Sequence, residues 1–248
     1  MQILFLGSAG SFVTASRSNP SILIDEDLLI DVGEGVTQKL LQFGSLKTIR
    51  KILISHLHVD HFIGIFSFLW HQWLVERDTS PIVIWGPPDI QNIHQILQIS
   101  YTPVDAFPFT INYEPLDPQD NILEFGEISV TRVLHPVYTL GFRINRDRSV
   151  CYSSDTAPLD RMIQLAQNCD VLIHEASFPT KFAKQAHKYF HSTPQDAAKI
   201  ANEARVKKLV LFHILGEFEE DFQVMQKEAQ DFFDGEVLIA EDMKILEI

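Results

Sequence analysis

The sequence predicts an α/β protein built from two β-sheets with helices on their outer faces. Short apolar runs of strand length alternate with amphipathic stretches of helical length, and tight turns join some of the runs into hairpins. Apolar residues make up 46% of the 248 residues, which is ample for a sizeable core. No low-complexity segment, fixed repeat or Gly/Ser-rich linker divides the chain, so we expect one domain over residues 1–248.

The first part of the chain begins with hairpins and continues as β–α alternation. The expected strands cover residues 2–6, 21–24, 28–31, 51–54 and 82–85. A tight Asp25-Glu26-Asp27 turn joins the second and third strands, and Gly86-Pro87-Pro88 ends the fifth. The expected helices are 34–43, which Gly44 closes, and 61–77.

The second part of the chain continues the alternation. The expected strands cover residues 128–134, 138–145, 149–153, 170–174 and 207–212, and a last pair lies at 236–240 and 243–247. The expected helices cover residues 159–167, 194–204 and 219–230. Because these helices separate or follow the strands, they are expected to cover the outside of a sheet.

Charge and cysteine content exclude several classes of protein. The net charge of −13 repels nucleic acid unless basic residues gather locally. Cys151 and Cys169 are too few for a disulfide framework, and we expect buried free thiols in a reducing cytosol. The N-terminus lacks the features of a signal peptide, and the longest strongly apolar stretch, 62–70, is too short to span a membrane. We therefore expect a cytoplasmic protein without a membrane partner.

The most informative segment is the run Ser-His-Leu-His-Val-Asp-His at residues 55–61, directly after an apolar strand. Imidazole and carboxylate are ligands that borderline divalent metals such as zinc prefer, at roughly 2.0–2.2 Å. On an extended loop His56 and His58 point to the same side, whereas Asp60 and His61 turn back where a helix begins. The segment therefore offers one ligand pair to each of two metal ions. We interpret it as a metal site rather than a run of solvated surface histidines.

Three further candidate ligands lie where predicted strands end. His135, Asp155 and His213 each follow an apolar run, at the edge where a layered α/β fold opens into a crevice. Taken singly, such residues are also typical of turns and of satisfied buried groups. Together with the four candidates at 55–61 they make a set of seven, which is the count that two metals sharing one carboxylate require. Water that bridges two metals is deprotonated near neutral pH and becomes a nucleophile.

In the order and type of these residues, the chain resembles the metallo-β-lactamase fold family. The five motifs of that family occur in order along the chain, as Asp31 within 29–35, the 56–61 motif, His135, Asp155 and His213. The resemblance spans nearly the whole chain and implies an αββα sandwich of two mixed sheets, with the metals at one edge.

The resemblance also implies a division of the ligands between two metal ions. One ion would be held by His56, His58 and His135, and the other by Asp60, His61 and His213. Asp155 would bridge the two ions, and Asp31 would brace the ligand loop.

Two further segments are similar to the ribonuclease Z group, which processes the 3′ end of tRNA. Residues 172–178 contain a sequence that looks like the group's His-Glu-Ala-Thr motif, and 191–193 is similar to its His-Ser-Thr motif. The N-terminal residues 7–21 also resemble the opening of such enzymes. A phosphodiester leaving alkoxide needs a proton, and a histidine oriented by a carboxylate can supply it near pH 7. We therefore expect a catalytic pair of Glu175 and His191, with a solvated strand end and a helix-terminal histidine as the alternatives.

The chain departs from the bacterial members of that group between His135 and Asp155. Bacterial ribonuclease Z inserts a long arm there to grip tRNA, whereas this chain has room only for two strands and short turns. Four arginines lie in or next to this stretch, namely Arg132, Arg143, Arg146 and Arg148. They could hold a phosphate or be scattered surface charge. Without an arm, and with a negative net charge, the sequence favours a smaller phosphodiester or another ester over RNA.

These observations predict a dinuclear hydrolase with two divalent metal ions, zinc first and manganese or iron as alternatives. The favoured function is a phosphodiesterase in which a metal-bridging hydroxide attacks and Asp60 accepts or orients the water proton. His191, with Glu175, would protonate the leaving group. The alternatives are a tRNA 3′-endonuclease, a lactone or thioester hydrolase, and a catalytically silent relative used for binding. Because no ligand is missing, the silent relative is disfavoured. The resemblance makes a homodimer the default assembly.

Overall fold

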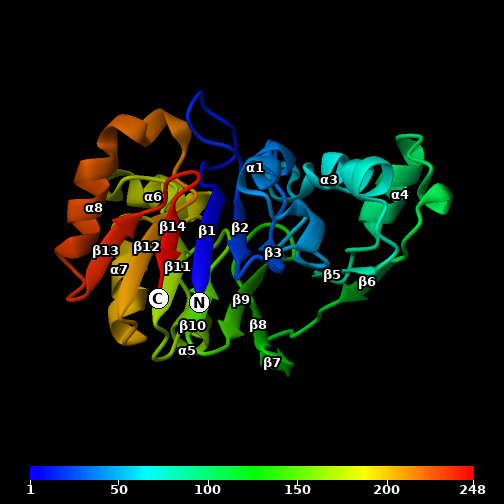
Figure 1. The fold of residues 1–248 in the computed structure, drawn as a ribbon. Coiled ribbons are helices and arrows are strands. Elements are labelled where there is room, and N and C mark those ends of the chain that lie inside the picture. Colours follow the sequence, from blue (N-terminus) through cyan, green and yellow to red (C-terminus); the bar gives the residue numbers. More distant parts are fainter.

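The computed structural model describes residues 1–248 and contains two seven-stranded sheets, both with parallel and antiparallel pairs (Figure 1). The strand order of the first sheet is β14 (Ile245–Glu247), β1 (Gln2–Gly7), β2 (Ser21–Ile24), β3 (Leu28–Ile30), β4 (Lys51–Leu53), β5 (Ile82–Gly86) and β6 (Ile111–Pro115). The order of the second sheet is β13 (Glu236–Ile239), β12 (Lys208–Phe212), β11 (Val171–Glu175), β10 (Ser149–Tyr152), β9 (Leu140–Asn145), β8 (Ile128–Arg132) and β7 (Ile122–Phe125).

Helices cover the outer face of each sheet, and shorter helical segments connect them. The helices are α1 (Val36–Phe43), α2 (Val59–Phe62), α3 (Ile65–His71), α4 (Asn92–Ile99), α5 (Asp160–Leu165), α6 (Ala183–Lys188), α7 (Pro194–Glu203) and α8 (Phe222–Gln230). The segment Gln72–Glu76 is a π-helix, and the 3-10 segments are Leu46–Thr48, Val104–Ala106, Thr180–Phe182 and Gly216–Asp221. No helix in the structure has the length and apolar character needed to cross a membrane.

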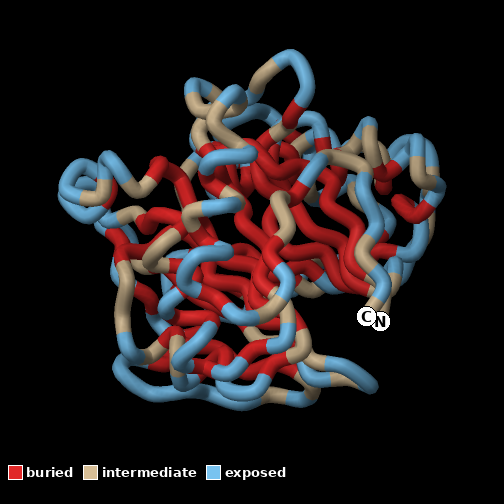
Figure 2. The backbone as a smooth tube through the Cα atoms, turned by 90° about the vertical axis from the view of Figure 1, so that its left-hand side faces the viewer, coloured by how far each residue is buried: buried red, intermediate tan, exposed pale blue.

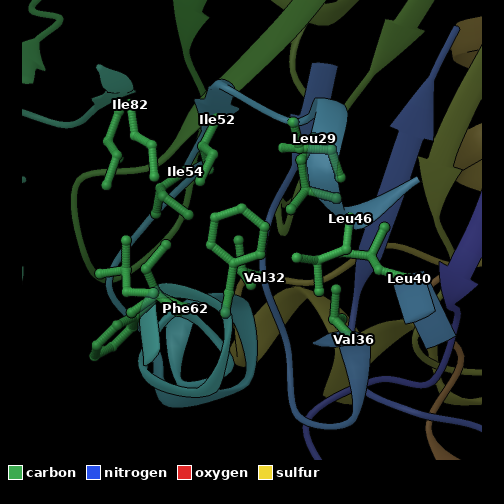
Figure 3. Packing of buried hydrophobic residues seen from close by; sticks show 14 of the residues in the cluster. Leu29, Val32, Val36, Leu40, Leu46, Ile52, Ile54, Phe62 and Ile82 are labelled. Atoms are coloured by element: carbon green, nitrogen blue, oxygen red, sulfur yellow. The ribbon is translucent and has the colours of Figure 1, made fainter. Parts of the chain in front are cut away.

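Three buried apolar layers hold this arrangement together. Alternation along β1 sends Ile3 and Phe5 into the layer between the sheets, whereas Leu4 and Leu6 face the helices outside. The first outer layer lies under α1, α3 and α4, and Figure 3 shows Phe62 beside Val32 within it. The second outer layer lies under α5, α7 and α8. Figure 2 shows the same burial along the backbone, with exposed segments confined to the periphery. The αββα sandwich expected from the sequence is therefore confirmed.

The expected helix at 61–77 is wrong, because the structure breaks it at Gly64 into α2, α3 and the following π-helix. The backbone of Gly64 packs directly against the residues that follow β3, because its N–H donates to the Val32 carbonyl at 2.9 Å. A Cβ at position 64 would lie 2.1 Å from the Gly33 carbonyl oxygen. This contact between distant segments stops a continuous helix from forming.

Other differences also arise from long-range packing. The strands expected as a last pair belong to different sheets, since β13 pairs with β12 and β14 pairs with β1. α4, α6, β6 and β7 were not expected, and α1 begins at Val36 because Gly35 has a φ of 84°. The other expected strands and helices are present, most of them within a few residues of their predicted bounds. Cys151 and Cys169 are buried free thiols, as expected.

Candidate metal centre

The candidate ligands come from loops at one end of both sheets. Residues 55–61 follow β4 of the first sheet, whereas His135, Asp155 and His213 follow β8, β10 and β12 of the second. Glu175 is the last residue of β11, beside these loops. The strand ends singled out in the sequence therefore meet at one edge of the sandwich.

One group of ligand-type atoms consists of three histidines and a carboxylate, all within 4.8 Å of one another. The Nδ1 atom of His58 lies 3.0 Å from the Nε2 atom of His56 and 3.2 Å from the Nε2 atom of His135. The Oδ2 atom of Asp155 lies 3.9 Å from His56 and 4.0 Å from His135. Three imidazole nitrogens and one carboxylate oxygen thus point at one place.

A second group contains Asp60, His61 and His213, again within 4.8 Å. The Oδ2 atom of Asp60 lies 3.4 Å from the Nε2 atoms of both histidines. The other oxygen of Asp155, Oδ1, lies 3.4 Å from His61 and 3.3 Å from His213. Each oxygen of the Asp155 carboxylate therefore faces a different group.

The chemistry of these residues fits divalent metal ions. The Nε2 atom of His61 and the Oδ1 atom of Asp155 are both buried and have no hydrogen-bond partner, although buried polar atoms are normally paired. Burial, together with the positive charge of nearby His61, lowers the pKa of His56 well below its usual range, so that its ring is neutral as a metal ligand requires. Burial alone would raise the pKa of Asp155, but the surrounding histidines hold it well below its usual range. Burial also lowers the pKa of His58 and His135, so the first group offers three neutral imidazoles and the ionised Asp155 carboxylate, donors that zinc and similar metals prefer.

Neighbouring groups fix the orientation of the candidate ligands. His61 Nδ1–H donates to the Asp31 carboxylate at 2.7 Å, and His213 Nδ1–H donates to the Ser177 hydroxyl at 3.0 Å. His135 Nδ1–H donates to the Phe190 carbonyl at 3.3 Å. In each ring a bond at Nδ1 leaves Nε2 for the centre, which is how histidine ligands are usually oriented.

Glu175 and His191 form a pair beside the two groups. The Nδ1–H of His191 donates to the Oε1 atom of Glu175 at 2.8 Å, and the Glu175 side chain is fully buried. His191 also shares a third group of ligand-type atoms with Asp155 and His213. Burial lowers the pKa of His191, but the Glu175 carboxylate more than compensates and raises it to about 9. Neither a solvated strand end nor an unpaired helix-terminal histidine describes this arrangement.

The sequence reasoning missed several residues that support the site. Ser177 lies within residues 172–178, where no sequence pattern indicates its role, and its hydroxyl lies 2.8 Å from Glu175 as well as 3.0 Å from His213. The Tyr152 hydroxyl donates to Asp31 at 3.0 Å. Phe190, with a φ of 61°, is one of several non-glycine residues at the site with a left-handed backbone. Such strained conformations are concentrated at functional sites, but no sequence pattern marked them.

Two of the four arginines singled out in the sequence, Arg146 and Arg148, lie away from the candidate centre. Arg146 and Arg148 are in the turn that precedes β10, whereas the candidate ligand Asp155 follows the other end of that strand. Arg146 forms ion pairs with Asp25, Asp27 and Glu127, and Arg148 lies 3.6 Å from Asp170. These cations are paired with acidic side chains, which supports the interpretation as surface charge.

Comparisons with known proteins agree with this geometry. The matching family model is described as a beta-lactamase superfamily domain and covers residues 27–214. Ribonuclease Z of Methanosarcina acetivorans is 28% identical over 310 residues, covering 100% of this chain and 98% of that protein. Among solved structures, the short form of human tRNase Z has a TM-score of 0.82 and 27% identity, covering 100% of this chain and 99% of its own. The metallo-beta-lactamase fold protein YhfI from Bacillus subtilis has the same TM-score, 25% identity and the same coverage.

Proposed function

We propose a function for this chain on one premise: it belongs to the β-lactamase superfamily. Its likeness to ribonuclease Z proteins and its histidine–aspartate cluster make it a metal-dependent hydrolase of the ribonuclease Z-like kind. Within that class, the proposed reaction is hydrolysis of a phosphodiester at a centre of two metal ions. The observation that carries this proposal is the Asp155 carboxylate, whose two oxygens face two separate ligand groups.

In this proposal the seven candidate ligands divide as the family resemblance implies. One divalent ion would be held by His56, His58 and His135 and the other by Asp60, His61 and His213, with Asp155 available to both. Zinc is the proposed metal, with manganese or iron as alternatives, because the donors are imidazole nitrogen and carboxylate oxygen. Such ions would polarise a phosphoryl oxygen and make a water molecule acidic enough to act as a nucleophile.

The protein's own residues would move the protons. Burial alone would raise the pKa of Asp60, but the neighbouring His61 and His213 lower it by more, so the net pKa is below its usual range. The Asp60 carboxylate is therefore ionised and can accept or orient a water proton. His191 is held by Glu175 through Nδ1, which leaves the proton on Nε2 for the departing alkoxide. Positioned acids of this kind contribute roughly 10²–10⁴-fold to the rate.

A small diester is proposed ahead of RNA. The alignment with the Methanosarcina protein runs over 310 residues, whereas this chain has 248, so that relative has dozens of residues without a counterpart here. Between His135 and Asp155 the structure contains only β9, β10 and short connections, so no arm for gripping tRNA projects from that stretch. The second candidate is a tRNA 3′-processing endoribonuclease, and the observation favouring it is that the similar proteins named above are a ribonuclease Z and a tRNase Z.

One experiment distinguishes the two candidates. Zinc- and manganese-loaded protein is assayed against bis(p-nitrophenyl) phosphate and a precursor tRNA at roughly 0.15 M salt, with Asp155→Ala as the inactive control. We expect metal-dependent hydrolysis of the diester and weak cleavage of the tRNA, because phosphate contacts supply much of nucleic-acid affinity and the protein is acidic. Faster cleavage of the tRNA would establish the second candidate, and no hydrolysis of either would overturn the proposal.

The proposal also covers the domain organisation, the location and the assembly of the protein. Residues 1–248 act as one hydrolase domain, because both sheets contribute to the same buried layer and to the candidate centre. The buried thiols Cys151 and Cys169 support a reducing, cytoplasmic location. A homodimer is the assembly that the ribonuclease Z resemblance implies.

A further inference from the structure

A cleft of about 560 Å³ opens beside the candidate metal centre and shares one residue with it. One wall comes from the loop Ser11–Val13 after β1, and the other from α2 and the start of α3. Asp60 lines this cleft and also lies 3.4 Å from His61 and His213. A molecule bound at the metals would therefore have this cleft next to its reacting group.

The walls of the cleft expose apolar side chains that nothing in the chain covers. Phe12 is 50% exposed, Val59 is 62% exposed, and Val13 and Ile63 are also accessible. These side chains come from two segments far apart in the sequence, but they line the same cleft. Scattered single apolar residues are ordinary on a surface, whereas an apolar cleft that opens beside polar catalytic groups is typical of a ligand site.

The charges in the cleft select against anions. Its ionisable side chains are Asp60 and Glu34, both acidic, and no lysine, arginine or histidine lines it. A phosphate chain entering this cleft would find no cationic side chain there, so it would gain none of the side-chain contacts that supply nucleic-acid affinity. An uncharged arm would instead cover the exposed apolar side chains and gain from their burial.

The loop wall is anchored to the candidate centre. The Gly10 N–H donates to the carbonyl of Ile214, the residue after His213, at 3.0 Å. On the other side of the loop, the Thr14 hydroxyl donates to Glu219 at 2.6 Å. Phe12 and Val13 are therefore held between two fixed points, one of them next to a candidate ligand.

We infer that this cleft receives an uncharged apolar arm of the ester substrate, with Phe12 and Val59 as specificity-determining residues. The inference rests on the proposed function, because it assigns the substrate class of the same site. It predicts that esters with an aryl or similar neutral arm are preferred over esters whose arm carries a further negative charge.

Binding of simple phosphonates to the zinc-loaded protein tests the inference without requiring turnover. Calorimetry would compare methylphosphonate, phenylphosphonate and 4-carboxyphenylphosphonate. We expect phenylphosphonate to bind about tenfold more tightly than methylphosphonate, which corresponds to roughly 1.4 kcal/mol, and the carboxylated compound to bind more weakly than phenylphosphonate. Phe12→Ala should remove most of the phenyl preference, whereas Phe232→Ala, which truncates an exposed phenylalanine just after α8, should retain it.

A charge reversal supplies the second test. Val59→Lys should make 4-carboxyphenylphosphonate bind more tightly than phenylphosphonate, because the added cation pairs with the carboxylate. Equal binding of all three phosphonates, or a preference that survives both Phe12→Ala and Val59→Lys, would overturn the inference. Hydrolysis of bis(p-nitrophenyl) phosphate, measured on the same preparations, separates the two proposals. Turnover without arm preference rejects the cleft alone, and arm preference without turnover rejects the hydrolytic function.

Discussion

Replacing Asp31 with alanine should weaken the metal centre without removing a candidate ligand. The Asp31 side chain is 1% exposed, and its carboxylate accepts four hydrogen bonds. Oδ1 accepts from the Ser55 N–H at 2.7 Å. Oδ2 accepts from the Ser55 hydroxyl at 2.9 Å, from His61 Nδ1 at 2.7 Å and from the Tyr152 hydroxyl at 3.0 Å. One carboxylate thus joins the ligand loop to a strand of the other sheet.

The structure sets the size of the expected effect. Alanine leaves the Ser55 N–H, His61 Nδ1–H and Tyr152 hydroxyl without their acceptor, at about 1–3 kcal/mol for each buried donor. The left-handed backbone at Asp31, with a φ of 55°, adds roughly 1–2 kcal/mol for alanine. Because water entering the space would satisfy some donors, we expect a loss of about 3–6 kcal/mol in the free energy of unfolding. Losing the group that orients His61 should also weaken metal binding by about 10- to 100-fold.

Two measurements on Asp31→Ala test this reasoning. Urea unfolding of the metal-free protein gives the stability change, and zinc competition with a chelator gives the affinity. Tyr152→Phe is the matched control, because it removes one of the four hydrogen bonds and should cost only about 0.5–1.5 kcal/mol while retaining zinc affinity. Zinc affinity within twofold of the wild type in Asp31→Ala would refute the bracing role. So would a stability loss in Tyr152→Phe as large as that in Asp31→Ala.

Three other variants test the centre and the fold. Asp155→Ala should lower the metal content from about two ions per chain to at most one, measured by elemental analysis, because no other carboxylate faces both ligand groups; an unchanged content would contradict the shared-ligand role. His191→Ala should retain metal but lower kcat about 10²–10⁴-fold for an alkoxide leaving group and only slightly for nitrophenolate; equal losses on both would exclude the acid role. In the wild type, Glu175 outweighs burial and raises the pKa of His191 to about 9, while bound cations would lower it. The alkoxide rate should therefore fall as pH rises within the range 6.5 to about 9, since the donor then loses its proton, and a rate that rises with pH there would count against it. Gly64→Ala should lower the melting temperature sharply, because its Cβ would lie 2.1 Å from a backbone carbonyl oxygen, and a melting temperature like that of the wild type would show that the backbone there can move.

Local patterns determined much of what was predictable. Strand runs such as 51–54 and 207–212 were identifiable because side-chain periodicity and turn residues act over a few positions. The segment 55–61 was identifiable for the same reason, since its imidazoles and carboxylate are close together in the chain itself. For residues such as His213, the sequence indicated a polar group at a strand end that completes a set of seven candidate ligands, and the family resemblance supplied the division of that set between two metal ions.

Only the tertiary structure decided how these parts combine. Several contacts join residues that are distant in sequence. Asp155 lies between the two ligand groups, the Tyr152 hydroxyl donates to Asp31, and the Ser177 hydroxyl contacts both Glu175 and His213. The same holds for the break at Gly64 and for the separation of β13 and β14 into different sheets. Such contacts depend on which strands pair and how two sheets face each other, and these choices are settled by burial over the whole chain rather than by neighbouring residues. The sequence by itself therefore determined the kinds of candidate ligand and their order, and the packing of the two sheets decided that they meet around the Asp155 carboxylate beside an apolar cleft.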